Sequence, residues 1–166
     1  MGMGDACGHH HRAETGLAPA EIMAALGEAE ARCERRGERM TAPRRRVLEL
    51  LLTSGEPVKA YDLIAAYGDD GQAAKPPTVY RALEFLERQG LAHRIASISA
   101  YVACSHGDRT HAAAFLICDC CGAAVEVSPP PAAGLNEPAA LYGYALERVT
   151  IEGHGLCADC RPAAAA

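Results

Sequence analysis

The chain has 166 residues, of which 49% are hydrophobic, and its formal net charge is −5. This hydrophobic fraction is ordinary for a folded protein and argues against wholesale disorder. The longest uncharged apolar run, 112–117, is far shorter than the ~20 residues that a membrane-spanning helix needs. The N-terminal residues lack the apolar stretch of a secretion signal. We therefore expect a soluble, cytoplasmic protein without a membrane partner.

The cysteines favour metal binding over disulfides. There are eight of them, and cytosolic thiols stay reduced. Five of the eight crowd the C-terminal part of the chain, as Cys118, Cys120, Cys121, Cys157 and Cys160. A disulfide framework would spread its cysteines more evenly, whereas metal sites collect them in close pairs.

The negative net charge hides a basic segment. Residues 32–46 contain seven arginines against only Glu34 and Glu38. Local charge, rather than net charge, attracts a protein to phosphates. A solvated helix face would also explain an isolated basic run, so the segment indicates nucleic-acid binding only together with the elements around it.

Four helices are expected in the first two thirds of the chain. Apolar residues at helical spacing define the first, namely Ile22, Leu26, Ala29 and Cys33. Thr41 as N-cap and Pro43 in the first turn mark the second helix, which ends at Gly55. The third is expected over 60–67, followed by a loop.

The fourth helix begins at Pro76-Pro77 and ends at Gly90, a standard pair of start and stop signals. Val79, Ala82, Leu83 and Leu86 form its apolar face. Two short strands follow, 91–96 and 99–104, around a turn at Ser97-Ile98. Helices and a hairpin in this order predict a winged helix-turn-helix whose fourth helix enters the major groove of DNA.

The pattern changes after this hairpin to strand, turn, strand, helix and strand. The expected elements are two strands, a helix and a returning strand at 112–118, 123–127, 132–142 and 145–152. The predicted fold class is α+β. The chain is expected to begin with a disordered tail (1–16) and a winged-helix domain (17–105). A small α/β domain (106–161) and a second tail (162–166) follow. Cys7 and His9–His11, in the first tail, are assigned no site.

Two Cys-x-x-Cys pairs carry the strongest signal, Cys118 with Cys121 and Cys157 with Cys160. Brought together, they present four thiolates tetrahedrally, as in a structural zinc site of zinc-ribbon type. Gly122 would allow a tight turn in which backbone N–H groups reach the sulfurs, and Cys120 lies out of register. The sequence has neither the His-x-Glu of zinc deaminases nor the His-Glu-x-x-His of zinc proteases. A saturated site leaves no position for a substrate, so we expect no enzyme and no small organic substrate.

Several motifs together resemble the ferric uptake regulator (Fur) superfamily, most closely its zinc uptake regulators (Zur). They are 75–83 (KPPTVYRAL), 101–104 (YVAC), Thr110-His111, the Cys118 pair with Gly122, and 152–160 (EGHGLCADC). The resemblance covers roughly residues 18–161, with the motifs in order.

The resemblance implies a cytosolic homodimer that binds zinc, two ions per protomer, and then binds double-stranded operator DNA to repress zinc-acquisition genes. It assigns the structural zinc to the two cysteine pairs. It assigns a regulatory zinc between the domains to four further residues, His93, Cys104, His111 and Glu126. It also makes the C-terminal domain the dimerisation domain.

Two departures from the iron-sensing relatives concern additional metal sites. Their His-His-x-His run is replaced here by Ala112, Ala113 and Phe115, and a histidine of their last strand by Arg148. The roles of His106, Asp108 and His154 therefore stay open. A thiolate in the regulatory set favours Zn²⁺ over Mn²⁺ and, less strongly, over iron. Two alternatives remain: an iron- or peroxide-responsive regulator of the same superfamily, and a zinc-ribbon module that binds protein or RNA.

DNA contacts are expected near the N-terminal end of the fourth helix, where recognition helices touch base edges. Tyr80 and Arg81 are the candidates for base contacts, and Thr78 is placed to reach a phosphate. Arg44 resembles the arginine of the family's Thr-x-x-Arg motif, here beginning at Thr41, and is expected to contact the DNA backbone.

Overall fold

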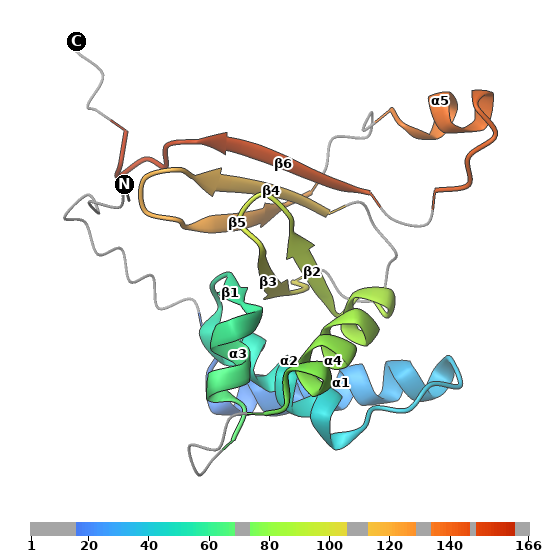
Figure 1. The fold of residues 1–166 in the computed structure, drawn as a ribbon, viewed down its shortest axis with the longest axis vertical. Helices are drawn as coiled ribbons and strands as arrows, with labels where there is room; N and C mark the ends of the chain where they lie inside the picture. Colours follow the sequence, from blue (N-terminus) through green and yellow to red (C-terminus); the bar gives the residue numbers. More distant parts are fainter. Residues whose placement is uncertain (1–15, 69–73, 106–112, 129–133, 147–148, 162–166) are drawn as a thin grey trace. The chain divides into compact units, whose positions relative to one another are not determined.

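The computed structural model describes residues 16–68, 74–105, 113–128, 134–146 and 149–161. These residues form two compact units, which we call the helical unit (16–105) and the C-terminal unit (113–161). The predicted tails and the predicted boundary after residue 105 fall almost wholly outside the described residues. Within those residues, no helix is both long and apolar enough to cross a membrane. The predicted α+β class is confirmed (Figure 1).

The first helix, α1 (Pro19–Arg35), buries the predicted apolar face of Ile22, Leu26, Ala29 and Cys33. Pro19 opens it at a position where no backbone donor is needed. The second helix, α2 (Ala42–Ser54), has Thr41 at its N-cap position as predicted, although the threonine side chain makes no capping hydrogen bond. Its end at Gly55 is confirmed, because Gly55 adopts a left-handed φ of 64°.

The next two helices, α3 (Ala60–Ala66) and α4 (Pro76–Arg88), form a helix-turn-helix that packs against α2 (Figure 1). Helix α4 buries its predicted apolar face of Val79, Ala82, Leu83 and Leu86, together with Phe85. Gly90 has a φ of 65°, and its N–H donates to the Glu87 carbonyl at 2.9 Å. The Leu91 N–H donates to the Leu86 carbonyl at 2.8 Å. This pair of bonds is a Schellman motif, which explains why the predicted stop at Gly90 holds.

A three-stranded sheet follows α4, in the order β1-β3-β2. Strands β2 (Ala92–Ile95) and β3 (Ala100–Ala103) form the predicted hairpin, with a turn that is two residues longer than predicted and contains Ser99 at φ 52°. Strand β1 (Val58–Lys59), between α2 and α3, was not predicted. It is too short to show alternation and exists because it pairs with β3.

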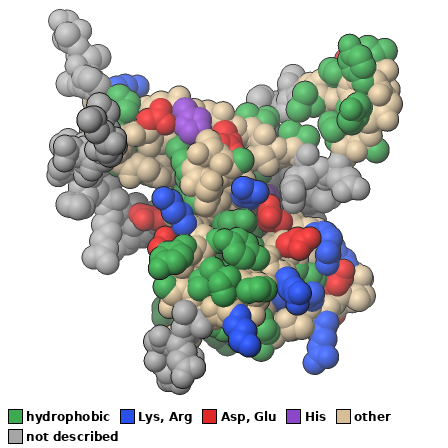
Figure 2. All heavy atoms as spheres, viewed as in Figure 1, with side chains coloured by type: hydrophobic (Ala, Val, Ile, Leu, Met, Phe, Trp, Pro, Cys, Tyr) green, Lys and Arg blue, Asp and Glu red, His purple; other side chains and the backbone are tan. Residues whose placement is uncertain are grey.

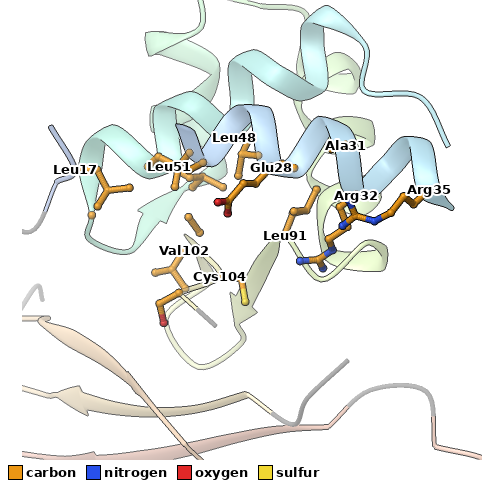
Figure 3. A pocket seen from close by; sticks show the side chains of 16 residues that line it. Leu17, Glu28, Ala31, Arg32, Arg35, Leu48, Leu51, Leu91, Val102 and Cys104 are labelled. Atoms are coloured by element: carbon orange, nitrogen blue, oxygen red, sulfur yellow. The ribbon is translucent and has the colours of Figure 1, made fainter. Parts of the chain in front are cut away.

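A pocket of about 600 Å³ lies inside the helical unit, between α1, α2 and the end of β3 (Figure 3). Its wall is largely apolar and includes Leu48, Leu51 and Leu91. Two residues with chemical roles described below, Arg32 and Cys104, also line it. The pocket therefore adjoins both the C-terminal half of α1 and one predicted zinc ligand.

The C-terminal unit contains a sheet of β4 (Ala113–Cys118), β5 (Ala124–Val127) and β6 (Thr150–Gly155), in the order β5-β4-β6. Strand β4 pairs antiparallel with β5 and parallel with β6. The prediction of the last strand at 145–152 was wrong in its bounds, because pairing with β4 extends the strand through Gly153 to Gly155. Gly153 allows close approach, since a Cβ there would lie 3.3 Å from the Leu116 side chain.

The remaining helix of this unit, α5 (Asn136–Leu141), buries none of its residues in the isolated chain. Large apolar side chains on and after it are among the most exposed in the described chain: Leu141 at 81%, Tyr142 at 77% and Tyr144 at 72%. Figure 2 shows hydrophobic side chains gathered on the surface of this helix. Exposed apolar surface of this kind marks a binding face.

Candidate metal centre and nucleic-acid interface

The four cysteines of the two Cys-x-x-Cys pairs meet at one end of the C-terminal sheet. Cys118 ends β4 and lies opposite Gly155 of the parallel strand β6, so the chain that leaves β6 delivers Cys157 and Cys160 next to the first pair. The four Sγ atoms all lie within 4.8 Å of one another. The predicted grouping of these four residues is therefore present in the structure.

The spacing of the sulfurs fits a zinc ion. A tetrahedral site with Zn–S bonds of about 2.3 Å places its sulfurs about 3.8 Å apart. The Sγ atoms of Cys121 and Cys157 are 3.9 Å apart. Four thiolates at this spacing form a closed donor set, which leaves no coordination position for water or substrate.

Backbone N–H groups surround the sulfur of Cys118. The Cys157 N–H donates to it at 3.3 Å. Hydrogen bonds from the backbone of Cys121 and of Cys157 lower the pKa of Cys118 to about 6, which favours the thiolate, the zinc-binding form. The turn that allows this depends on Gly122, which has a φ of 77° and donates its N–H to the Cys118 carbonyl at 2.9 Å.

Two residues between the first pair of cysteines, Asp119 and Cys120, lie beside the cluster. Cys120 is exposed and does not belong to the four-cysteine group, as predicted. His154 of β6 lies 2.8 Å from a carboxylate oxygen of Asp119, through Nδ1. The Asp119 N–H also donates to the Gly155 carbonyl at 2.8 Å. Asp119 thus ties the first cysteine turn to β6, a contact that sequence reasoning missed because nothing local marks it.

The helical unit brings together two of the residues assigned to regulatory zinc. His93 is buried on β2, Cys104 directly follows β3, and their ligand atoms lie within 4.8 Å of each other. The Cys104 N–H donates to the Leu91 carbonyl at 3.0 Å, which holds the end of β3 against the start of β2. An imidazole and a thiolate at this distance are suitable ligands for one Zn²⁺.

The other residues of that set belong to the rest of the chain. Glu126 lies on β5 of the C-terminal unit, where it pairs with Phe115 and is half-buried. His111 lies outside the described residues, as do His106 and Asp108, whose roles the sequence left open.

The candidate DNA-contacting residues of α4 occupy its first half. Tyr80 and Arg81 are exposed, on the side opposite the buried face. Thr78 is half-buried in the first turn, and its N–H donates to the Lys75 carbonyl at 2.8 Å. An exposed aromatic ring and a guanidinium near the start of the second helix of a helix-turn-helix are suited to contact base edges.

The arginine-rich segment is partly occupied by contacts within the helical unit. The guanidinium of Arg44 lies 3.5 Å from the centre of the Phe85 ring and also donates to the Arg39 carbonyl. Arg45 pairs with Glu30 at 2.8 Å, and Arg46 pairs with Glu49 at 3.0 Å. The charge cluster seen in the sequence therefore stabilises the packing of α1, α2 and α4 as well as supplying positive charge.

Comparisons with known proteins agree with this geometry. The ferric uptake regulator family matches residues 35–154. The zinc uptake regulation protein of Escherichia coli strain K12 is 42% identical over 137 residues, which cover 81% of this chain and 80% of the relative. The protein of the same name from Mycobacterium tuberculosis H37Rv is 32% identical over 129 residues, covering 75% of this chain and 96% of the relative.

Two solved structures are similar across most of the chain. A zinc uptake regulator complexed with zinc and DNA matches with a TM-score of 0.76 and 40% identity, covering 84% of this chain and 94% of the other. The holo form of XcZur matches with a TM-score of 0.72 and 41% identity, covering 86% and 98%. On its motifs, its fold and these similarities, the chain belongs to the ferric uptake regulator family.

Proposed function

We propose that the protein is a zinc-responsive transcriptional repressor: a cytoplasmic homodimer that, when loaded with zinc, binds operator DNA and represses zinc-acquisition genes. The observation that carries this proposal is the extensive similarity to a zinc uptake regulator solved with zinc and DNA. The four-thiolate cluster and the exposed α4 surface support it from within the chain. The protein is a binding protein and not an enzyme.

The first zinc is structural and is held by Cys118, Cys121, Cys157 and Cys160. When bound, it crosslinks two segments that lie far apart in the sequence. The N–H groups around Cys118 favour its thiolate and so favour metal retention. Because all four ligands are protein thiolates, this site contributes folding free energy rather than signalling.

The second zinc, which brings the total to two per protomer, is regulatory and is held by His93, Cys104, His111 and Glu126. A thiolate, two imidazoles and a carboxylate suit Zn²⁺. The proximity of His93 and Cys104 within the helical unit supports the assignment, and the family resemblance supplies the other two ligands.

In this proposal, these four ligands link zinc binding to DNA binding. His93 and Cys104 belong to the unit that contains α4, whereas Glu126 belongs to the unit that contains the four cysteines. A zinc ion held by ligands from both units fixes the orientation of the recognition helix in each protomer. In a dimer this sets the spacing of the two recognition helices, and that spacing must match the helical repeat of DNA. By linkage, operator DNA then tightens zinc binding by the same factor that zinc tightens DNA binding.

DNA recognition uses the first half of α4. Tyr80 and Arg81 contact base edges in the major groove, and Thr78 contacts a phosphate. Arg44 contributes positive charge near the DNA backbone from α2, while its stacking on Phe85 fixes the guanidinium. The contacts of Arg44 with both Phe85 and the Arg39 carbonyl support a fixed position for that charge.

A second copy of the chain covers the exposed apolar face of the C-terminal unit. The support is the absence of any buried residue in α5 and the high exposure of Leu141, Tyr142 and Tyr144. Covering this face removes apolar surface from water, which is the main driving force for association. Symmetric dimers are the commonest homo-oligomers and match two-fold operators.

The test is a gel shift with the promoter region of the gene's own operon, using protein treated with chelator and then given Zn²⁺, Fe²⁺ or Mn²⁺. We expect a zinc-restored shift of the promoter duplex and little effect of the other metals. If iron or peroxide, and not zinc, controlled the shift of the promoter duplex, the signal would be iron or peroxide. Binding of RNA without binding of the duplex would overturn the assignment as a repressor.

The Cys104→Ser variant separates the two zinc sites, because Cys104 is not part of the structural cluster. We expect a folded dimer that retains one zinc per chain and no longer binds the promoter in response to zinc. A Cys104→Ser protein that responds to zinc like the wild type would place the sensor elsewhere.

A further inference from the structure

The C-terminus of the recognition helix α4 is held by two arginines from the end of α1. Arg32 is only 7% exposed, and its Nη2 donates to the Gln89 carbonyl and, at 3.0 Å, to the Gly90 carbonyl. Arg36 adds a bond from Nη1 to the same Gln89 carbonyl at 3.1 Å. We call these bonds the α1–α4 clamp.

The clamp lies at the C-terminal end of α4, where a positive charge stabilises a helix. The last carbonyls of a helix have no partner within the helix and carry its negative dipole end, so a cation there is stabilising. Bonds from a charged donor are stronger than neutral ones, and burial of Arg32 limits screening by water and salt. The fit is close, because a Cβ at Gly90 would lie 3.0 Å from Nη2 of Arg32.

The same few residues lead directly to the predicted zinc ligands of the helical unit. Leu91 follows the clamped carbonyls, is buried, and lines the same pocket wall as Arg32 and Cys104 (Figure 3). Its N–H bonds to the Leu86 carbonyl of α4, and its carbonyl accepts the N–H of Cys104. His93 lies two residues further on. Helix α4, the clamp and two zinc ligands thus meet around one short segment.

We propose that Arg32 is a positioning residue for zinc-dependent DNA binding, because its bonds hold the short link between α4 and β2, the strand that carries His93. The inference rests on the proposed function. With the clamp in place, the link between β2 and α4 is rigid. Zinc that fixes His93 and Cys104 therefore also fixes the position of Tyr80 and Arg81 on α4. Without the clamp, the joint between α4 and β2 loosens, and zinc binding orients the DNA-contacting side chains less effectively.

The experiment compares full-length wild type with Arg32→Met, which keeps the apolar stem and removes the donors. The measured quantity is the ratio of the Kd for promoter DNA without added zinc to the Kd with saturating zinc, taken well below the melting temperature. We expect Arg32→Met to lower this ratio about tenfold, with full occupancy of the four-cysteine site. Arg36→Met, which removes the part-buried bonds of Arg36 to Gln89 and leaves those of Arg32, is expected to lower it less.

Controls separate positioning from general stability. Arg45→Met also removes one positive charge and a charged bond, that of α2 to Glu30 of α1, but this bond is not part of the α1–α4 clamp. It should therefore leave the ratio unchanged even if it lowers the melting temperature. Arg32→Lys should restore part of the ratio. If Arg32→Met does not fold, Arg36→Met carries the test.

The outcomes test the proposed function and the positioning role of Arg32 separately. Wild type that shows no zinc-dependent shift contradicts the proposed function. Wild type that responds to zinc, alongside folded Arg32→Met and Arg36→Met proteins with an unchanged ratio, overturns the positioning role alone. A lower melting temperature with an unchanged ratio likewise makes the clamp purely structural.

Discussion

Replacing one thiolate of the four-cysteine cluster should unfold the C-terminal unit. In Cys157→Ser, a zinc ligand is lost together with part of the geometry that directs the Cys157 N–H to the sulfur of Cys118. A serine hydroxyl is a poor substitute for a thiolate at zinc. The same reasoning applies to Cys118→Ser, at the end of β4.

The expected loss for one thiolate is comparable with the total stability of the unit. Structural zinc supplies about 10–16 kcal/mol in small zinc domains, so an even division gives about 2.5–4 kcal/mol for each thiolate. A unit of ~50 residues has a total stability of about 2.5–7.5 kcal/mol. Among the described residues of this unit, Phe115 and Ile117 are the large hydrophobic side chains that are buried, and each contributes about 1.5–3 kcal/mol. The core therefore cannot compensate for the metal.

The assay combines zinc content, light scattering after size exclusion, and thermal unfolding followed by circular dichroism. We expect Cys157→Ser to lose zinc, to run as a monomer or aggregate, and to keep the melting transition of the helical unit. Cys120→Ser is the matched control, because Cys120 lies between the paired cysteines but outside the cluster. A Cys157→Ser protein that remains a dimer with wild-type zinc content would refute the reasoning.

Three further substitutions test other parts of the molecule. Arg81→Ala should weaken promoter binding by ~1–3 kcal/mol and leave random duplex binding nearly unchanged, as measured by competition gel shifts; equal weakening of both would make Arg81 a phosphate contact. Gly90→Ala should lower the free energy of unfolding by about 1–2 kcal/mol in urea titrations, because a left-handed φ and the nearby Arg32 both disfavour a side chain; no change would contradict the strain argument. Leu141→Glu should shift the dimer toward monomer in sedimentation experiments without loss of structural zinc, and an unaffected dimer would place the interface elsewhere.

Local signals in the sequence determined most of the helical unit. Spacing at helical period identified the buried faces of α1 and α4, and these faces are the ones that the structure buries. Gly55 and Gly90 marked helix ends because each adopts a left-handed backbone conformation that other residues avoid. These properties depend on neighbours within a few residues, so the sequence alone is sufficient to find them.

The grouping of the four cysteines was also predictable, for a chemical reason. Cysteine pairs at this spacing have few other uses in a reduced compartment, and the donor type predicts the metal. The regulatory set was different. Isolated residues such as His93 and Glu126 have no local signature, and only the resemblance to the family selected them.

Long-range contacts decided what the sequence left out or misplaced. Strand β6 runs through Gly153 because the neighbouring strand β4 supplies its hydrogen bonds. Asp119 meets His154, and Arg32 meets the Gln89 carbonyl, only after the chain has folded. The first of these two side-chain contacts joins residues 35 positions apart, and the second joins residues 57 positions apart. Their energies depend on burial and on geometry in three dimensions, which no local pattern of residues encodes.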